Sequence, residues 1–441
     1  MADQPIAPQF TDADDFAAHA PPIVGRTRAQ AQAPAAPREA VQRRGLLAAI
    51  DPYLVAIVVT LIAFGGMMVY STTFDWSFQD FGSSTAIFFN QFRWMAVGVG
   101  VAALLMIIDY RVWKRFAVPI LLSTIGILLA VLLFSDFRFG ARRAFLNGSY
   151  QPSELAELAM IIYMAAWLSA KNARLGSLVR GLLPFGVIVG TVALLVVLQP
   201  DLSAAVMVVA VAGAMYFLAG ANWMHLGAII GVLVAGVIFL SSAGLLPEYA
   251  QDRIDEYVTG ITDLTQSSYH TRQAVIAFVN GGWTGVGLGN GRQKYGPLPA
   301  PHTDSIFATI GEELGVIGAS VVIGLYIAFV MRGLRISRRA PDTFGTLLAA
   351  GVAMWVAIKA VLNIAVMLNV LPQTGTPLPF ISYGGSSLVA LMAGVGLLLS
   401  VARVTARQEA TPKRKSASAN TDRGWRNGGT RLSGAGNRRG A

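Results

Sequence analysis

Long runs of uncharged, apolar residues recur along this chain and restrict the folds open to it. Several of these runs approach the roughly 20 residues that a helix needs to cross a bilayer. Only 13% of the residues are charged, against about 25% in an ordinary soluble domain. The short alternating segments of a transmembrane β-barrel are absent from the sequence. The sequence therefore predicts an all-α polytopic membrane protein.

Hydropathy predicts ten membrane segments. Their approximate ranges are 53–71, 94–108, 117–134, 154–170, 181–198, 203–219, 226–246, 305–330, 343–368 and 382–402. Basic residues gather in alternate connections, which predicts that those connections and both termini are cytoplasmic. The expected membrane domain is 51–404, with one long extracytoplasmic loop, 247–304, between the seventh and eighth segments. Disordered cytoplasmic tails are expected at 1–50 and 405–441.

Composition excludes several classes of function. The net charge of +10 comes mostly from the basic tail 405–441, which would be drawn to anionic lipid rather than to nucleic acid, since no folded module accompanies it. The chain has no cysteine, so it has no disulfide framework and no zinc–thiolate chemistry. Its four histidines are scattered, with no pair at metal-binding helical spacing.

Six ionisable residues lie in or at the edge of the apolar segments. They are Glu154, Glu157, Asp201, Glu312, Glu313 and Lys359. A charge at the centre of a membrane helix costs roughly 2.5–3.5 kcal/mol on insertion scales, so each is a candidate for function. The alternative is a helix-end position or a charge pair that fixes packing. Glu154 and Glu157 share one helix face, whereas Glu312 and Glu313 point to different faces.

Two irregular segments lie on the side predicted to be extracytoplasmic. The glycine-rich 281–294 lacks Walker spacing and a preceding strand, so its glycines indicate close backbone packing or a sharp turn near a ligand. Residues 371–388 contain three prolines and no charge, which predicts backbone that lines a cavity. Several polar and charged residues accompany these segments, among them Arg142, Arg143, Lys294, His270 and Asp304. The combination indicates a membrane-embedded site for an amphiphile with an anionic group.

Seven motifs, in order, resemble the SEDS family of bacterial cell-wall polymerases, the FtsW/RodA group, and the FtsW branch more than RodA. They are "GARR" (140–143), "YQPSELAELA" (150–159), "QPDLSAA" (199–205), "YHTRQAVIAF" (269–278), "GVGLGNGRQK" (285–294), "PHTDSIFATIGEELG" (301–315) and "LPQTGTPLPFISYGGSS" (371–387). The resemblance covers about residues 50 to 405. It implies a ten-helix protein of the bacterial cell membrane with its active site on the extracytoplasmic side.

The resemblance implies a peptidoglycan glycosyltransferase that uses lipid II, a disaccharide–peptide on undecaprenyl pyrophosphate. Asp304 falls on the family's catalytic carboxylate and would act as general base; on sequence alone, a helix N-cap is the competing role. The expected substrate-binding residues are Arg142, Arg143, Glu154, His270, Gln273, Lys294, His302, Ser382 and Ser386. A divalent cation, Mg²⁺ or Mn²⁺, is expected with unknown ligands. The expected partners are a class B penicillin-binding protein and other division or elongation proteins.

The chain departs from the usual family pattern at four positions. They are Ala144 for Trp, Glu157 for Lys, Ser305 for Phe and Lys359 for Gln. The changes at Glu157 and Lys359 predict that the two residues face one another across the fourth and ninth segments, because a pair offsets part of the cost of each charge. A lipid II flippase and a non-catalytic division scaffold stay open as alternative functions.

Overall fold

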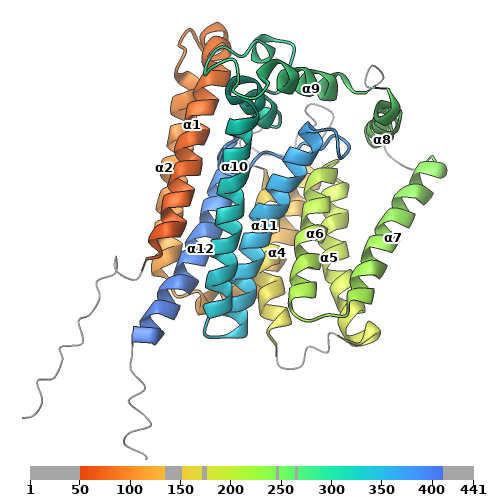
Figure 1. The fold of residues 1–441 in the computed structure, drawn as a ribbon. Coiled ribbons are helices and arrows are strands. Elements are labelled where there is room, and N and C mark those ends of the chain that lie inside the picture. The colour runs from red at the N-terminus through yellow and green to blue at the C-terminus, as the bar shows by residue number, and fades with distance from the viewer. Residues whose placement is uncertain (1–49, 135–150, 171–175, 245–247, 264–266, 411–441) are drawn as a thin grey trace, which may run out of the picture. The chain divides into compact units, whose positions relative to one another are not determined.

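The computed structural model describes residues 50–134, 151–170, 176–244, 248–263 and 267–410 (Figure 1). Within these residues the chain is helical and contains no β-strand. The helices are α1 (Pro52–Phe81), α2 (Ala86–Ile107), α3 (Arg111–Phe134), α4 (Pro152–Leu168), the π-helical turn η4 (Leu178–Leu182) with α5 (Leu183–Val197), α6 (Leu202–Leu218), α7 (Trp223–Ser242), α8 (Glu248–Thr262), α9 (Tyr269–Gly281), the 3₁₀ turn η6 (Gln293–Tyr295), α10 (Ile306–Arg339), α11 (Thr343–Met367) and α12 (Gly385–Ala410).

In the described parts of the chain, seven helices are long and apolar enough to cross a bilayer. They are α1, α2, α3, η4 with α5, α10, α11 and α12. The protein is therefore a multi-pass membrane protein, as the sequence predicts. The other three predicted segments coincide with α4, α6 and α7, and their crossing of the membrane stays a prediction. Most of both predicted tails lies outside the described residues.

The connections of the bundle gather at its two ends. At the lower end in Figure 1, the α2–α3 and α10–α11 connections meet, since Tyr110 donates a 2.5 Å hydrogen bond to Asp342 and Arg111 forms a 2.9 Å ion pair with the same carboxylate. At the upper end lie α9 and the segments 282–305 and 368–384, which together we call the loop end. Which end faces the cytoplasm stays a prediction.

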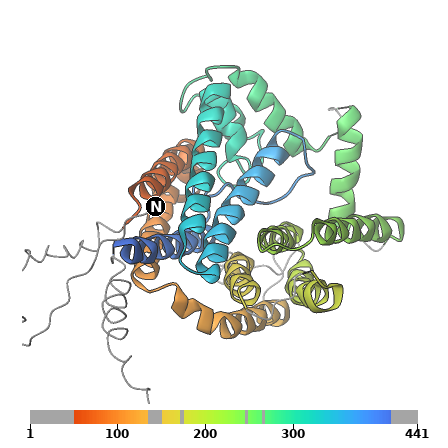
Figure 2. The same cartoon turned by 60° about the horizontal axis from the view of Figure 1, so that its bottom comes forward.

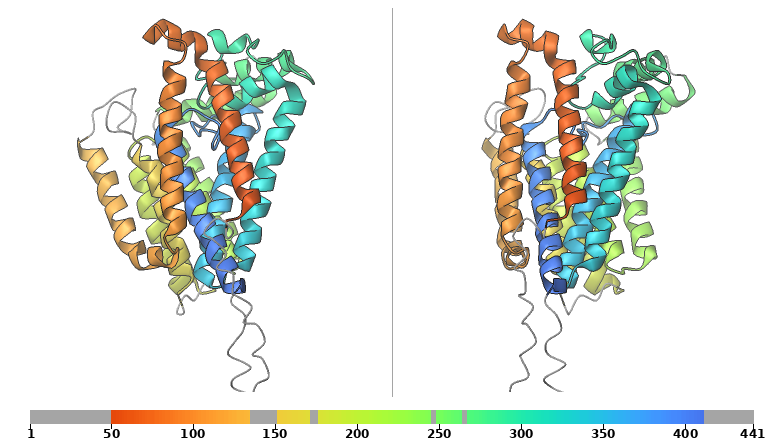
Figure 3. Two further views of the ribbon diagram at one scale, coloured as in Figure 1. Left: turned by 90° about the vertical axis from the view of Figure 1, so that its left-hand side faces the viewer. Right: turned by 60° about the vertical axis from the view of Figure 1, so that its left-hand side comes forward.

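Helix α11 forms much of the buried centre of the bundle. It packs against α10, α6, α4 and α12, and its side chains include the fully buried Trp355 and Lys359. Helix α12 packs along α2, as Figure 3 shows. Figure 2 shows α7 and α8 at the periphery. The intramembrane charge Lys359 is therefore enclosed by protein.

The long connection predicted at 247–304 contains two helices, α8 and α9. Helix α9 begins where the Ser268 side chain accepts a hydrogen bond from the Thr271 backbone N–H at 3.1 Å. Its buried positions Ala274, Ala277 and Gly281 recur at helical spacing, and α9 packs on α10. Small residues at these positions bring the two helices close together. The stripe is short and weakly apolar, so hydropathy does not reveal it.

Candidate functional site

Asp304 lies at the loop end, immediately before α10. Its side-chain Oδ2 is next to Gly375, where a Cβ atom would come within 3.4 Å of it. The backbone N–H of Gly375 in turn donates to Ser203 Oγ at the start of α6, at 3.1 Å. Ser305, rather than Asp304, occupies the N-cap position of α10. The carboxylate therefore sits where the segments before α10 and after α11 meet.

Four hydrogen bonds fix the backbone of the two segments around this carboxylate. Asn363 of α11 donates to the Asp304 carbonyl at 2.7 Å and to the Thr376 carbonyl at 2.8 Å. Ser382 Oγ donates to the Thr303 carbonyl at 2.6 Å, and the Tyr383 N–H donates to the His302 carbonyl at 2.8 Å. Three consecutive carbonyls thus have fixed partners, which orients the Asp304 side chain. Ser382, predicted to bind substrate, has this supporting contact and is buried.

His270 connects α9 to both segments around Asp304. Its Nε2 hydrogen-bonds to Ser305 Oγ, and its Nδ1 to the Gln373 amide. The Ser305 hydroxyl donates to the Pro299 carbonyl at 2.6 Å, so Nε2 carries the proton and Nδ1 accepts. That pattern requires a neutral ring. Burial, with a smaller contribution from the Arg253 charge, lowers the pKa of His270 to about 4.

His302 is also buried, and its ring forms one wall of the loop end. Its ring centroid lies 4.5 Å from that of Trp76 in α1 and 5.8 Å from that of Tyr383. Burial lowers the pKa of His302 to about 4, so this imidazole is neutral at physiological pH. Its Nδ1 is buried and has no hydrogen-bond partner among the described residues.

The predicted meeting of Glu157 and Lys359 is confirmed, and Glu154 joins them. Lys359 Nζ of α11 lies 2.6 Å from Glu154 Oε2 and 3.0 Å from Glu157 Oε2. Trp355 Nε1 donates to Glu157 Oε2 at 2.5 Å. All three charged side chains are buried. Lys359 lies one helical turn before Asn363, which holds the Asp304 carbonyl, so α11 carries both the triad and a contact to the Asp304 segment.

Asp201 connects two of the sequence motifs. It caps α6 by accepting a 3.2 Å hydrogen bond from the Ala204 N–H. Its Oδ2 also accepts hydrogen bonds from Gln151 Nε2 at 2.7 Å and from Ser153 Oγ at 3.0 Å. These partners lie at the start of α4. Asp201 therefore joins the start of α4 to the start of α6 through hydrogen bonds.

The glycine loop, residues 282–292, completes a break inside α10. Gly315 has φ +67°, so the helix is interrupted there. The Val286 and Gly287 N–H groups donate to the Glu312 and Glu313 carbonyls at 3.0 Å each, and the Gly282 carbonyl accepts from the Val316 N–H at 2.9 Å. The loop backbone thus replaces the partners that the break removes. Its glycines serve close backbone packing, one of the two roles predicted.

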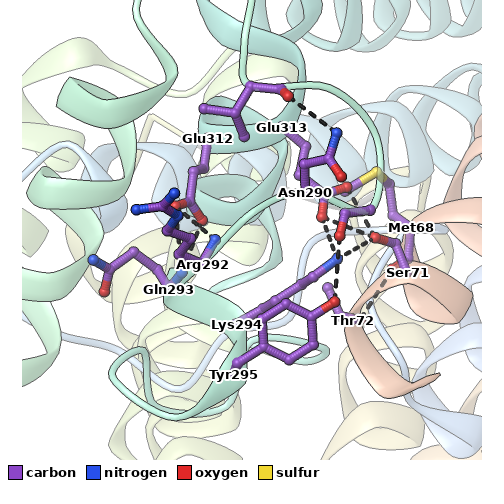
Figure 4. Close-up of polar contacts among 12 residues, drawn as sticks. Met68, Ser71, Thr72, Asn290, Arg292, Gln293, Lys294, Tyr295, Glu312 and Glu313 are labelled. Atoms are coloured by element: carbon purple, nitrogen blue, oxygen red, sulfur yellow. Dashed lines mark hydrogen bonds and ion pairs between the residues drawn. The ribbon is translucent and has the colours of Figure 1, made fainter. Parts of the chain in front are cut away.

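Glu312 and Glu313 anchor this loop (Figure 4). Glu312 Oε1 accepts from the Arg292 N–H at 3.0 Å. Glu313 forms a buried 2.6 Å ion pair with Lys294 and accepts a 2.9 Å hydrogen bond from Ser71 of α1. Both carboxylates are fully buried, and the structure gives each a packing role. Lys294, predicted to bind an anion of the substrate, already neutralises Glu313.

Of the remaining predicted site residues, the structure describes two and leaves two outside the described ranges. Gln273 on α9 and Ser386 in the first turn of α12 are half-buried at the loop end. Arg142 and Arg143 lie outside the described residues. Asn363 and Tyr383 contact the Asp304 segment but are absent from the predicted site. Asn363 is a polar amide inside an apolar run, and this is the sequence signal that could have identified it as a site residue.

The chain is similar in sequence to named proteins and in fold to solved structures. Residues 52–407 match the FtsW/RodA/SpoVE family, described as "Cell cycle protein". The "Probable peptidoglycan glycosyltransferase FtsW" of Geobacter sulfurreducens is 37% identical over 80% of this chain and 94% of its own length. The "Stage V sporulation protein E" of Bacillus subtilis is 36% identical over 80% of this chain and 96% of its own length.

Two solved structures share the fold. One is described as "Structural coordination of polymerization and crosslinking by a peptidoglycan synthase complex"; it has a TM-score of 0.66 and 27% identity, and the match covers 81% of this chain and 98% of that one. The other is the rod shape determining protein RodA of Thermus thermophilus, with a TM-score of 0.58 and 26% identity, covering 80% of this chain and 97% of that one.

Proposed function

Because the chain belongs to the FtsW/RodA/SpoVE family of cell cycle proteins, we propose that it is a peptidoglycan glycosyltransferase that polymerises lipid II into glycan strands. The observation that carries this proposal is the carboxylate of Asp304, which sits among the segments that carry the motifs and whose backbone is fixed by Asn363, Ser382 and Tyr383. Relatives named peptidoglycan glycosyltransferase support the reaction class.

In the proposed reaction, Asp304 is the general base. It removes the proton from a sugar hydroxyl of the acceptor while that oxygen attacks the anomeric carbon of the donor. The bond from that carbon to the pyrophosphate oxygen breaks, and undecaprenyl pyrophosphate leaves with the bonding electrons. A single displacement inverts the anomeric centre. A well-placed base contributes typically about 10²–10⁴-fold to such a step.

Positive charge is needed where the pyrophosphate leaves. Lys294 is poorly suited to supply it, because its ammonium is buried against Glu313 at 2.6 Å. Arg142 and Arg143 of the "GARR" motif are the better candidates in the sequence. We therefore assign the pyrophosphate to these arginines, and the loop end to the extracytoplasmic side of the bacterial cell membrane.

A divalent cation would accompany the pyrophosphate rather than occupy a protein cage. No group of three His, Asp or Glu side chains that could hold a metal lies within the described residues. Mg²⁺ bound through one or two carboxylates and substrate phosphates needs no such group, and no step above is routed through a metal. We expect EDTA to lower polymerisation by purified protein and added Mg²⁺ or Mn²⁺ to restore it. Full activity in EDTA would remove the cation from the proposal.

A transpeptidase partner follows from the product, because glycan polymerisation leaves peptides uncrosslinked. We propose a class B penicillin-binding protein, with other division or elongation proteins around it. The solved peptidoglycan synthase complex that shares the fold is described as coordinating polymerisation with crosslinking. That likeness supports a partner of this class.

One experiment separates this function from a lipid II flippase and from a non-catalytic scaffold. Purified protein in detergent is given labelled lipid II, alone and with a class B penicillin-binding protein, and glycan products are resolved on a gel. We expect glycan strands. A flippase or a scaffold would form no polymer in this assay, and of these two only a flippase would move labelled lipid II across the membrane when the protein is placed in vesicles.

A further inference from the structure

A groove of about 480 Å³ lies beside the Asp304 segment, between the last turns of α1 and residues 294–302. Asp75, Trp76 and Gln79 line it from α1, and Tyr295 and His302 line it from the other side. Figure 4 shows Tyr295 near Thr72 of α1, which also lines the groove. The reaction proposed above does not use these α1 residues.

His302 places this groove close to the proposed base. It forms part of the groove wall, and Asp304 follows two residues later. Two residues of extended chain span at most about 7 Å. The Asp304 carboxylate itself lies on the side of Gly375. A ligand in the groove would therefore be adjacent to the reacting groups without displacing them.

The groove has exposed aromatic rings together with hydrogen-bonding groups. Trp76 is 45% exposed and Tyr295 is 55% exposed, so both leave ring surface for a ligand. Gln79 Nε2 donates to Asp75 Oδ2 at 2.9 Å, one helical turn away, which orders both side chains on the groove. A carboxylate accepts hydrogen bonds from hydroxyls, and an amide can donate or accept.

This combination fits a sugar ring better than the other parts of lipid II. A pyranose has an apolar C–H face that packs on an aromatic ring and an edge of hydroxyls that donates to a carboxylate. Pyrophosphate is disfavoured because Asp75 is acidic and the nearby Lys294 is already paired with Glu313. A polyprenyl chain would cover the Asp75 carboxylate and the Gln79 amide with hydrocarbon, which offers them no hydrogen bond.

We propose that this groove is a saccharide subsite, in which Trp76 packs on a pyranose ring of the glycan next to the bond formed at Asp304, and Asp75 accepts from its hydroxyls. The identity of the sugar rests on the proposed function, whereas the recognition of a pyranose rests on the groove alone. Trp76 and Asp75 are binding residues here, because neither reaches the reacting atoms in this arrangement.

The first test measures binding of a lipid-free tetrasaccharide of alternating GlcNAc and MurNAc to detergent-solubilised protein, by saturation-transfer NMR titration. We expect Trp76→Ala to raise Kd roughly tenfold, because an aromatic contact is removed. Trp76→Phe, which keeps a ring, should retain most of the affinity, and Asp75→Asn should weaken it. Phe78→Ala is the matched control, since Phe78 lies on the same turn, is 61% exposed and does not line the groove.

The second test measures lipid II polymerisation by the same variants. We expect Trp76→Ala to raise KM more than it lowers kcat, since it removes a binding contact. Failure of the wild type to bind the tetrasaccharide, or equal binding by wild type and Trp76→Ala, overturns the subsite even if polymerisation is normal. If the wild type binds the sugar through Trp76 but forms no polymer, the subsite stands and the proposed glycosyltransferase function fails.

Discussion

At the scale of single residues, hydrogen bonds to the backbone fix the segment that carries Asp304. Asn363, Ser382 and Tyr383 hold the carbonyls of three consecutive residues, 302 to 304. His270 holds Ser305 on the following side. Ser305 stands where the family usually has Phe. At this position a hydrogen bond to His270 therefore takes the place of apolar packing. In the proposed reaction, the orientation of the general base then depends on side chains that do not react.

The neutral histidines give a testable dependence of stability on pH. The pKa of both His270 and His302 falls from an ordinary 6.5 to about 4 in the folded protein. As pH falls from 6.5 toward 4, the unfolded chain binds protons that the folded chain does not, so stability is lost over that window. The loss should reach on the order of 1–3 kcal/mol for each histidine. Melting temperatures in one detergent between about pH 7.5 and pH 5 measure it.

His270→Asn and His302→Asn provide the control for this effect. Each variant should start from a lower melting temperature at neutral pH but lose less on acidification than the wild type, because one proton no longer binds on unfolding. A slope that is the same in the wild type and both variants would contradict the assignment of the effect to these two rings.

At the scale of elements, the break in α10 and the glycine loop form one unit. Gly285 shows why glycine is required: with φ +80°, a Cβ there would lie 2.1 Å from the Glu313 carbonyl oxygen. Gly289 also has φ +80° but has open space around it. A comparison of alanine substitutions at Gly285 and Gly289 therefore separates the free-energy cost of the backbone conformation from the cost of the steric clash.

Gly289→Ala should therefore destabilise the protein by about 1–2 kcal/mol through backbone conformation alone. Gly285→Ala should cost about 1–3 kcal/mol more, because it also overpacks the contact with α10. Thermal unfolding of the two variants in the same detergent measures the difference. Equal losses would mean that the loop does not pack into the helix break as described.

For the buried triad of Glu154, Glu157 and Lys359, we predict that substitutions of different members cost different amounts of stability. Lys359→Gln leaves Glu154 and Glu157 buried without their cation, which should cost about 3–5 kcal/mol. Glu157→Gln leaves the 2.6 Å pair of Lys359 with Glu154 in place, so its cost should be within about 1 kcal/mol. Unfolding of both single variants and the double variant gives the coupling energy. A Glu157→Gln loss as large as that of Lys359→Gln would contradict this arrangement.

At the scale of the whole molecule, sequence patterns predicted the helices better than the contacts between them. Hydropathy places a helix at each predicted segment because apolar length is a local property of the chain. It does not reveal α9, whose buried stripe is short and made of small residues. The pairing of Glu157 with Lys359 is predictable because two unpaired charges in a membrane are costly, but the added contact with Glu154 depends on three-dimensional packing.

The site was predicted unevenly for the same reason. Motifs identify Asp304, His270, His302 and Ser382 as important, and all four lie at the loop end. The motifs do not show that the charge of Lys294 is already neutralised by a buried ion pair with Glu313. They also miss Trp76, because a single aromatic residue at the end of an apolar helix is typical of a membrane interface. Only the fold places it against His302.

The central claim, that Asp304 is the general base of a glycosyltransferase, is tested most directly by the rate of lipid II polymerisation with purified Asp304→Asn. The change is nearly isosteric, so folding should be kept, and the melting temperature checks this. Asp252→Asn on the exposed face of α8 is the matched control and should polymerise at the wild-type rate. We predict that Asp304→Asn loses about 10²–10⁴-fold in rate. Polymerisation by Asp304→Asn at a rate close to that of the wild type would contradict the account.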